Sequence, residues 1–359
     1  MATFLITDSD NGIVNNNFHY LLGFQPTHWW IAIRSDSIHI FLDNRYYAKT
    51  KKINKHHITE TTWKKDIQYH KVTGPLIDLM LITCESSKNI ELEENLTLKY
   101  FHEINDKSDL GTSNNPKKTS VIPNYFEWQR IIKNDWEIKK MKKAIEVIDN
   151  VSLFIQYLVD TNEIHGKTES EVRKIILNKI LEFGWDDESF EAIVAFWVHS
   201  AVPHHTATDT IIEDGPLLID MWAKHKGYCS DFTRTFWVGK KTDDYEEFIK
   251  VYSSVKKASI KATLWARVGM RASQIDSLAR KSIIKDGYWD YFSHSTGHWV
   301  GLNIHEWPWI THMSDDKIKT GMMFTIEPGI YLPGKFWVRI ENIVLAKEER
   351  VKCMSKIRY

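Results

Sequence analysis

Cysteine is scarce in this chain of 359 residues, and its three copies are far apart: Cys84, Cys229 and Cys353. Their number is odd, and none belongs to a Cys-x-x-Cys motif. A disulfide framework or a zinc knuckle needs paired and closely spaced cysteines. The sequence therefore predicts reduced thiols and a fold that depends on its own hydrophobic core.

An excess of charge of either sign is also lacking, because 47 basic residues balance 47 acidic residues. This balance indicates neither a nucleic-acid partner nor binding to an anionic membrane. No apolar run approaches the roughly 20 residues that a membrane span requires. The N-terminus has no basic segment followed by an apolar stretch, which a secretory signal would show. We expect a cytoplasmic protein with a small-molecule or peptide substrate.

The chain is long enough for two domains, and its hydrophobic content of 43% allows a sizeable core. We predict an α+β protein with an α/β domain over residues 1–125 and a second, larger domain over residues 126–359. Alternating apolar residues predict strands at 30–34 and 37–42, and the polar stretch 105–119 predicts a surface loop or linker. Apolar residues at helical spacing predict four helices, at 137–158, 169–183, 245–266 and 273–285.

Two carboxylate residues flank a predicted hairpin in the middle of the chain. Asp220 and Asp231 lie in strand-like runs that are separated by a polar break ending at Gly227. If the turn is centred on His225 and Lys226, the two aspartates face each other. Opposed residues of a hairpin share one face, with Cβ atoms about 4.5–5.5 Å apart.

A second hairpin near the C-terminus repeats this arrangement. A turn centred on Gly334 sets Glu327 against Glu341. Like charges that face each other destabilise a sheet unless a cation lies between them or their pKa values are raised. Together with His298, the four carboxylates predict a site for two metal ions. Oxygen ligands with one imidazole suit Mn, Co, Fe or Zn, and two such ions can activate water and polarise a carbonyl for hydrolysis.

The chain from about residue 128 to the C-terminus resembles the pita-bread metallopeptidases, which include methionine aminopeptidase, Xaa-Pro aminopeptidase and Xaa-Pro dipeptidase (prolidase). The resemblance rests on five stretches: Asp214-Gly-Pro-Leu-Leu-Ile-Asp220, Gly227-Tyr-Cys-Ser-Asp-Phe-Thr-Arg-Thr235, His294-Ser-Thr-Gly-His-Trp-Val-Gly-Leu-Asn-Ile-His-Glu306, Thr325-Ile-Glu-Pro-Gly-Ile-Tyr331 and Val338-Arg-Ile-Glu-Asn342. It implies a C-terminal pita-bread fold. More weakly, residues 20–24 and 41–46 resemble the smaller creatinase-like N-terminal domain of prolidases and aminopeptidases P.

The resemblance implies a role for each of the five metal-ligating residues. It implies that Asp231 and Glu341 bridge two divalent ions, that Asp220 binds one of them, and that His298 and Glu327 bind the other. We expect manganese first, with cobalt, zinc or iron as alternatives.

Further catalytic residues are implied by the same resemblance: Glu327 as a proton shuttle, His204, His294 and His305 near the substrate, and Arg339 beside a metal-ligating carboxylate. The expected substrate is a peptide with proline in second position, and the expected assembly is a homodimer. A methionine aminopeptidase, a metal-free creatinase-type enzyme and a non-catalytic binding protein of the same fold are the alternatives. The first would share the ligands, whereas the second would have lost some of them.

Tryptophan is frequent, with 15 copies, and several stand where the family pattern usually has glycine. The four positions are Trp197, Trp222, Trp289 and Trp337. Glycine permits positive φ angles and close backbone approaches that an indole does not. Two explanations are open: a UGA codon that the source organism reads as glycine, or a lineage that has repacked its site around tryptophan. Genuine tryptophans at 222 and 337 would crowd the metal pocket.

Overall fold

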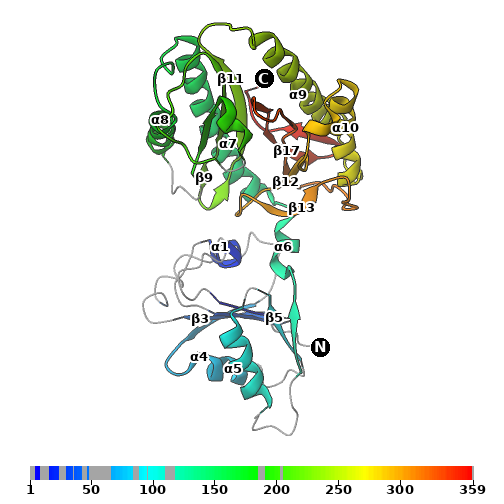
Figure 1. Ribbon diagram of the computed structural model, residues 1–359. Coiled ribbons are helices and arrows are strands. Elements are labelled where there is room, and N and C mark those ends of the chain that lie inside the picture. The colour runs from blue at the N-terminus through cyan, green and yellow to red at the C-terminus, as the bar shows by residue number, and fades with distance from the viewer. Residues whose placement is uncertain are drawn as a thin grey trace. The chain divides into compact units, whose positions relative to one another are not determined.

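The computed structural model describes residues 5–8, 16–23, 30–34, 36–42, 47, 66–83, 89–94, 96–109, 118–184, 191–202 and 205–357. The chain forms two compact units, Met1–Arg130 and Ile131–Tyr359 (Figure 1). Within the described ranges, no helix combines the length and the apolar character that crossing a membrane requires.

The N-terminal unit is built on a six-stranded mixed sheet with strand order β4-β3-β2-β1-β5-β6. Its strands are β1 (Leu5–Asp8), β2 (Trp30–Ile33), β3 (Ser37–Leu42), β4 (Asp66–Lys71), β5 (Asn89–Glu93) and β6 (Lys118–Ile122). Its helices are α1 (Asn16–Leu22), α4 (Leu76–Thr83), α5 (Leu98–Asp109) and α6 (Tyr125–Arg130). The two predicted strands are β2 and β3, which pair antiparallel with Trp30 opposite Phe41. Both strands are buried along their whole length.

The predicted linker at 105–119 is wrong at both of its ends. Helix α5 continues to Asp109 and β6 begins at Lys118, while residues 110–117 lie outside the described ranges. The polar side chains of this segment belong to the exposed face of a helix, where Lys107 Nζ lies 2.7 Å from Asp78 Oδ1. The other face is anchored by Ile104, which is fully buried. An amphipathic helix end was thus mistaken for a loop because its charged face dominates the sequence.

The C-terminal unit contains most of the strands and the four long helices. The helices are α7 (Asp135–Asp160), α8 (Glu169–Glu182), α9 (Tyr245–Trp265) and α10 (Ala272–Lys285), with short 3-10 turns η2 (Trp197–Ala201) and η3 (Trp289–Tyr291). One sheet has the order β11-β8-β7, from β7 (Ile193–Phe196), β8 (Gly215–Met221) and β11 (Phe232–Val238). The second has the order β13-β12-β14-β17-β18, from β12 (Gly297–Trp299), β13 (Glu306–Ile310), β14 (Met323–Ile326), β17 (Asn342–Lys347) and β18 (Arg350–Cys353). The unit also contains two short hairpins: β9 (Lys224–His225) with β10 (Tyr228–Cys229), and β15 (Gly329–Tyr331) with β16 (Trp337–Arg339).

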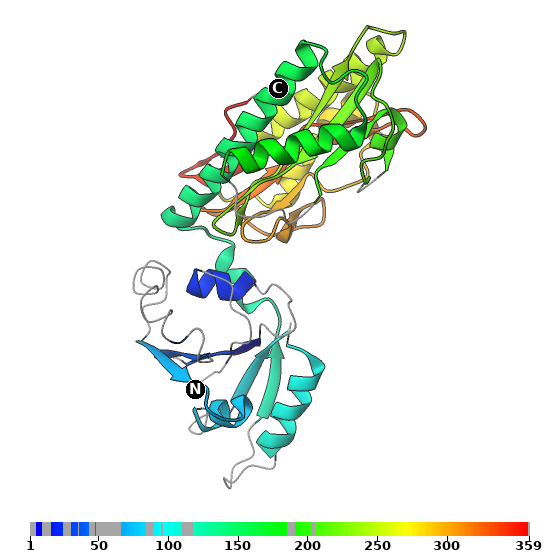
Figure 2. The same cartoon turned by 90° about the vertical axis from the view of Figure 1, so that its left-hand side faces the viewer.

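The helices cover the sheets in two pairs, as their apolar faces predict. Residues of α7 and α8 form one hydrophobic core with β7, β8 and β11, and Figure 2 shows these green helices lying across that sheet. Residues of α9 and α10 form another core with β12, β14 and β17. All four helices predicted from apolar spacing are present with ends close to the predicted ones. Capping boxes fix two helix starts, at Asn134 for α7 and at Thr168 for α8.

The first carboxylate hairpin differs from its prediction by one position in the turn. Its central residues are Lys226 and Gly227, with Tyr228 opposite His225, rather than His225 and Lys226. Both have positive φ angles, 47° and 84°, as a two-residue type I′ turn demands, and glycine suits the second of these positions. Asp220 is consequently opposite Thr233 and not opposite Asp231. The observed partner of Asp220 is therefore two residues from the predicted one. Because side chains alternate with a period of two, Asp220 and Asp231 still lie on the same side of the sheet.

The second hairpin has the predicted register. Gly329 pairs with Arg339 and Tyr331 pairs with Trp337, which centres the turn on Gly334. The φ of Gly334 is 71°, and this left-handed conformation explains why the turn forms there. The backbone N–H of Ile340 donates to the carbonyl of Pro328 at 3.4 Å, so the same pairing continues toward Glu327 and Glu341.

Candidate active site

The five predicted metal-ligating side chains line one cavity of about 310 Å³ in the C-terminal unit. Asp220 lies near the end of β8, Asp231 directly precedes β11, and His298 is the middle residue of β12. Glu327 follows β14, and Glu341 lies between β16 and β17. Segments from both sheets of the C-terminal unit therefore contribute to a single cavity.

His298 lies at the centre of the ligand-type side chains. Its Nε2 is 3.5 Å from Asp231 Oδ2 and 3.4 Å from Glu327 Oε1. Ligand-type atoms of Asp231, His298 and Glu341 all lie within 4.8 Å of one another, and all three residues are buried. The Nδ1 of His298 is 3.0 Å from the carbonyl oxygen of Trp299. That carbonyl can only accept, so Nδ1 carries the hydrogen and the lone pair of Nε2 faces the carboxylates.

Thr233 and Arg339 connect Asp220 to the rest of the site. The Thr233 Oγ1 lies 3.0 Å from Asp220 Oδ1 and 2.6 Å from Glu341 Oε2. Arg339 Nε donates to the same hydroxyl at 3.1 Å, and Arg339 Nη2 donates to Asp220 Oδ2 at 2.6 Å. The orientation of both acids thus depends on two residues that are not ligands themselves.

Burial and crowded negative charge shift the protonation of these groups. Burial, followed by the charge of Glu341, raises the pKa of Asp231 well above its usual value. Burial and the charge of Glu327 do the same to the pKa of Glu341. Burial also raises the pKa of Glu327 to about 7 and lowers the pKa of His298 to about 4. Imidazole is therefore neutral at pH 7, the form in which histidine binds metals.

The charges of the side chains that line the cavity favour the binding of cations. Four carboxylates line it together with a single guanidinium, that of Arg339, and neighbouring negative charges add to burial in raising the pKa values of Asp231 and Glu341. The His298 Nε2 lone pair adds a further electron-rich atom that faces carboxylate oxygens. Divalent ions would neutralise this charge and satisfy oxygen and nitrogen donors together. The residues present therefore fit a divalent metal centre.

Two of the three predicted histidines line the same cavity, His294 and His305. His294 Nδ1 lies 2.6 Å from the carbonyl oxygen of Ser295, and its Nε2 accepts from the hydroxyl of Tyr331. Burial, and then the charge of Arg339, lowers the pKa of His294 to about 3, so it is neutral. The ring of His305 packs edge-on against His298, with 4.5 Å between centroids. His204 lies outside the described residues.

The four tryptophans at glycine-pattern positions have different surroundings. Trp197 has a φ of 52°, the left-handed region that bulky residues rarely adopt. Trp337 lines the cavity, and its ring lies 3.8 Å from that of Tyr331 between centroids. Trp222 is buried, whereas Trp289 is 67% exposed. Of these four, only Trp197 has a backbone conformation that favours glycine.

Sequence reasoning missed three side chains that orient the site. Thr233 connects two carboxylates, as described above. Thr325 Oγ1 lies 3.2 Å from Glu327 Oε1 and accepts from the backbone N–H of His298 at 3.0 Å. Tyr331 donates to His294. All three lie in the quoted motifs, but only their contacts distinguish them from ordinary strand residues.

Known peptidases are similar to this chain over most of its length. Residues 139–348 match the model of metallopeptidase family M24. An Xaa-Pro dipeptidase of Pyrococcus horikoshii is 32% identical over 345 residues, which cover 95% of this chain and 91% of that protein. The solved structure of an Xaa-Pro dipeptidase from Bacillus anthracis superposes with a TM-score of 0.86 at 28% identity, covering 99% of this chain and 93% of that one. An X-Pro aminopeptidase from Thermotoga maritima gives 0.84 at 29% identity, with 100% and 97% covered.

These similarities confirm the α+β fold class, with a C-terminal pita-bread fold and a smaller N-terminal creatinase-like domain. They also confirm that the chain is a peptidase that depends on divalent metal ions. The match covers the cavity and every residue that lines it. The chain belongs to metallopeptidase family M24.

Proposed function

We propose that this protein hydrolyses the bond between an N-terminal residue and a proline in second position. The observation that carries this proposal is the convergence of five metal-ligating side chains with His294, His305 and Arg339 on one cavity of about 310 Å³. The names of the similar proteins, Xaa-Pro dipeptidase and X-Pro aminopeptidase, support the choice of substrate.

In this proposal the cavity holds two divalent ions. Asp231 and Glu341 would be shared between them, Asp220 would hold one, and His298 and Glu327 would hold the other. Manganese is our first expectation, followed by cobalt, zinc and iron, because carboxylate and imidazole donors suit this class of ion. Arg339 fixes the orientation of Asp220 through its 2.6 Å contact. A homodimer is part of the same proposal.

The bound ions would supply an activated water molecule and polarise the scissile carbonyl. The residues of the chain position the substrate and move protons. Glu327 takes up the proton that the attacking water releases and delivers it to the leaving nitrogen, a role open to a carboxylate that lines the cavity beside the ligand-type side chains. His305, which lines the same cavity, donates to the carbonyl oxygen as negative charge develops there.

Apolar side chains provide a place for the proline ring. Ile193, Ile304 and Trp309 line the cavity together with the charged residues. A bond to proline is a tertiary amide without an N–H group. A site shaped for it need not offer an acceptor there, and a secondary amide would bury an unpaired donor at a cost of about 1–3 kcal/mol. Proline in second position is therefore favoured.

The test is a comparison of three peptides, Ala-Pro, Ala-Pro-Ala and Met-Ala-Ser, with protein loaded in turn with each of the four metals. We expect cleavage of Ala-Pro-Ala far faster than of Met-Ala-Ser, and the rate on Ala-Pro distinguishes a dipeptidase from an aminopeptidase. Preferential cleavage of Met-Ala-Ser would instead indicate a methionine aminopeptidase. Cleavage of none, with metal bound, would indicate a binding protein.

Two variants test the assigned roles. Glu327→Gln keeps one amide oxygen for a metal but cannot carry a proton, so turnover should stop while metal remains bound. His305→Ala should lower kcat/KM for Ala-Pro-Ala by about 10²-fold with both ions still bound, because a positioned donor is lost. A near-normal rate in either variant would contradict its role.

A further inference from the structure

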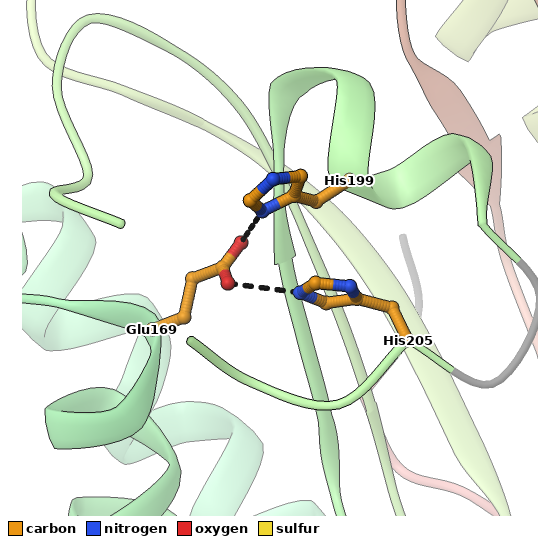
Figure 3. Close-up of side chains that lie close together, drawn as sticks. All are labelled: Glu169, His199 and His205. Carbon is orange, nitrogen blue, oxygen red and sulfur yellow. Dashed lines mark hydrogen bonds and ion pairs between the residues drawn. The ribbon is translucent and has the colours of Figure 1, made fainter. Parts of the chain in front are cut away.

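A second cluster of metal-ligating side chains lies in the C-terminal unit, and its members do not line the cavity described above. Glu169, His199 and His205 bring one carboxylate oxygen and two imidazole nitrogens within 4.8 Å of one another. Glu169 is the first residue of α8, His199 lies in η2, and His205 lies on the chain that follows. Figure 3 shows both rings pointing at the carboxylate, one at each oxygen.

The distances within this cluster are short and similar. His199 Nδ1 lies 2.9 Å from Glu169 Oε1, and His205 Nε2 lies 2.9 Å from Glu169 Oε2. The two imidazole rings are tilted by 31° with 4.6 Å between their centroids. The Glu169 side chain is fully buried, whereas the His199 side chain is 31% exposed. The cluster is therefore enclosed on the carboxylate side and reachable from solvent on the side of His199.

Glu169 has more hydrogen-bond donors around it than a carboxylate readily accepts. Besides the two histidines, its oxygens accept from the backbone N–H of Phe196 at 2.8 Å, and from the backbone N–H and the hydroxyl of Thr208 at 3.0 and 2.8 Å. A carboxylate offers about four lone-pair positions. Oε1 accepts from Phe196 and His199, whereas His205 and the two donor groups of Thr208 compete for Oε2. A cation placed among the three side chains would remove this competition, because each imidazole would then offer a lone pair instead of a hydrogen.

The carboxylate is ionised and held in place. Burial opposes its charge, but the N–H of Phe196 and the other donors outweigh burial, so the pKa of Glu169 lies below its usual value. A buried carboxylate with fixed orientation and two neighbouring imidazoles is a donor set of one oxygen and two nitrogens. Such sets bind borderline divalent ions, and zinc in particular takes three protein ligands with an open fourth position.

We propose that Glu169, His199 and His205 form a second, separate site for one divalent ion of the zinc, cobalt or nickel class. The three side chains supply three ligands, and the exposed side of His199 leaves room for water as a fourth.

Because of where the cluster lies, an ion bound there would connect three segments of the C-terminal unit. It would join the start of α8 to η2 and to the segment after it. In the same turn, Ser200 Oγ accepts the backbone N–H of Trp337 at 2.9 Å, and Trp337 lines the active-site cavity. An ion bound to His199 would therefore hold the turn against which β16 and its Arg339 are placed. We expect the ion to raise thermal stability and to order this side of the active site.

The experiment counts ions bound to the full-length protein. Protein is stripped with a chelator, dialysed against Zn²⁺, and analysed for zinc per chain by mass spectrometry. His199→Gln and His205→Gln are the test variants, because the amide can still donate to Glu169 but is a poor metal ligand. We expect each to bind one zinc equivalent fewer than the unmodified chain, or to bind that ion at least about tenfold more weakly.

His165→Gln is the matched control. His165 Nε2 lies 3.3 Å from Asp214 Oδ1, and this histidine–carboxylate pair lies in the same unit. The His165→Gln variant should bind as many zinc ions per chain as the unmodified protein. Equal zinc content in the unmodified chain and in both test variants would overturn the proposal.

A further variant separates this site from the active site. Asp231→Ala should lose the active-site ions and retain the ion bound by the cluster, with a rise in Tm on addition of Zn²⁺ that His199→Gln abolishes. If Asp231→Ala loses no ion while His199→Gln still loses one, the ligand assignment in the active site fails and the cluster site stands. If Asp231→Ala retains no zinc and shows no rise in Tm, the separate site is refuted.

Discussion

The hydroxyl of Thr233 offers the sharpest test of how the metal ligands are held. It is fully buried and lies within 3.0 Å of Asp220 and 2.6 Å of Glu341, and it accepts from Arg339. A hydroxyl has one hydrogen, so it donates to one of the two carboxylates at a time. Thr233→Val keeps the shape and the strand preference of the residue and removes only this hydrogen-bonding atom.

Two independent arguments give the size of the expected loss of metal affinity in Thr233→Val. A hydrogen bond to a charged group contributes about 1.5–3 kcal/mol. Loss of a residue that orients a metal ligand typically weakens metal binding about 10–100-fold, which corresponds to about 1.4–2.8 kcal/mol at about 1.4 kcal/mol per tenfold change. The two ranges overlap. We therefore expect Thr233→Val to bind Mn²⁺ or Co²⁺ about 10–100-fold more weakly, with activity largely restored when metal is in excess.

The assay is competition with a chelator of known affinity, and Thr235→Val is the matched control. Thr235 is buried on the same face of the same strand, but its hydroxyl contacts only the backbone of Arg339, at 3.3 and 3.1 Å. Both substitutions are chemically identical. If Thr233→Val binds metal as tightly as Thr235→Val does, the hydroxyl does not orient the ligands and the reasoning fails.

Three further predictions concern the cavity and the backbone. Trp337→Gly should raise kcat/KM for Ala-Pro-Ala up to about tenfold, because the indole takes up space in the cavity beside Tyr331 and an aromatic contact of this kind is worth about 0.5–1.5 kcal/mol; an unchanged or lower value would contradict this. The folded metal-free protein holds a proton on Glu327 up to a pH of about 7, whereas the unfolded chain loses it near 4.3. The Tm of metal-free protein should therefore fall as pH rises through this interval, and less steeply in Glu327→Gln; equal slopes in a thermal melt would refute it. Trp197→Gly should be more stable than Trp197→Ala by about 1–2 kcal/mol in denaturant unfolding, since both lose the indole and only glycine accepts the φ of 52° without strain; equal stability would show that this conformation is not required.

The two carboxylate hairpins show what sequence can predict about this site. Pro333 and Gly334 restrict the second turn to one position, and its register was predicted correctly. The first turn offered two neighbouring positions, and the choice depended on positive φ angles at Lys226 and Gly227 that the residue pattern did not reveal. Its error of two residues left both aspartates on one face. The prediction that the two aspartates share one site therefore did not depend on the exact register. A register shift by an even number of residues leaves each side chain on the same face of the sheet.

Contacts between segments far apart in sequence could not be predicted in the same way. Thr233 reaches Glu341 over a separation of 108 residues, and Glu169 reaches Thr208 over 39. Each of these residues is unremarkable within its own element, a threonine in a strand and a glutamate in the first turn of a helix. Their roles depend on how the sheets and helices pack, which local periodicity does not determine.

The packing of the two sheets also links metal binding to stability. Arg234, a buried cation in β11, donates to the carbonyl oxygen of Glu341 at 2.6 Å and to Asn342 Oδ1 at 2.7 Å. It thus holds the strand that follows Asp231 against the strand that follows Glu341, and the charge of Glu341 adds to burial in raising the pKa of Asp231. The polar contacts and the repulsion act across the same junction, so the metal-free protein is under electrostatic stress where its two sheets meet. Metal ions that bind the folded site and not the unfolded chain relieve this stress, and their binding free energy adds to the free energy of unfolding.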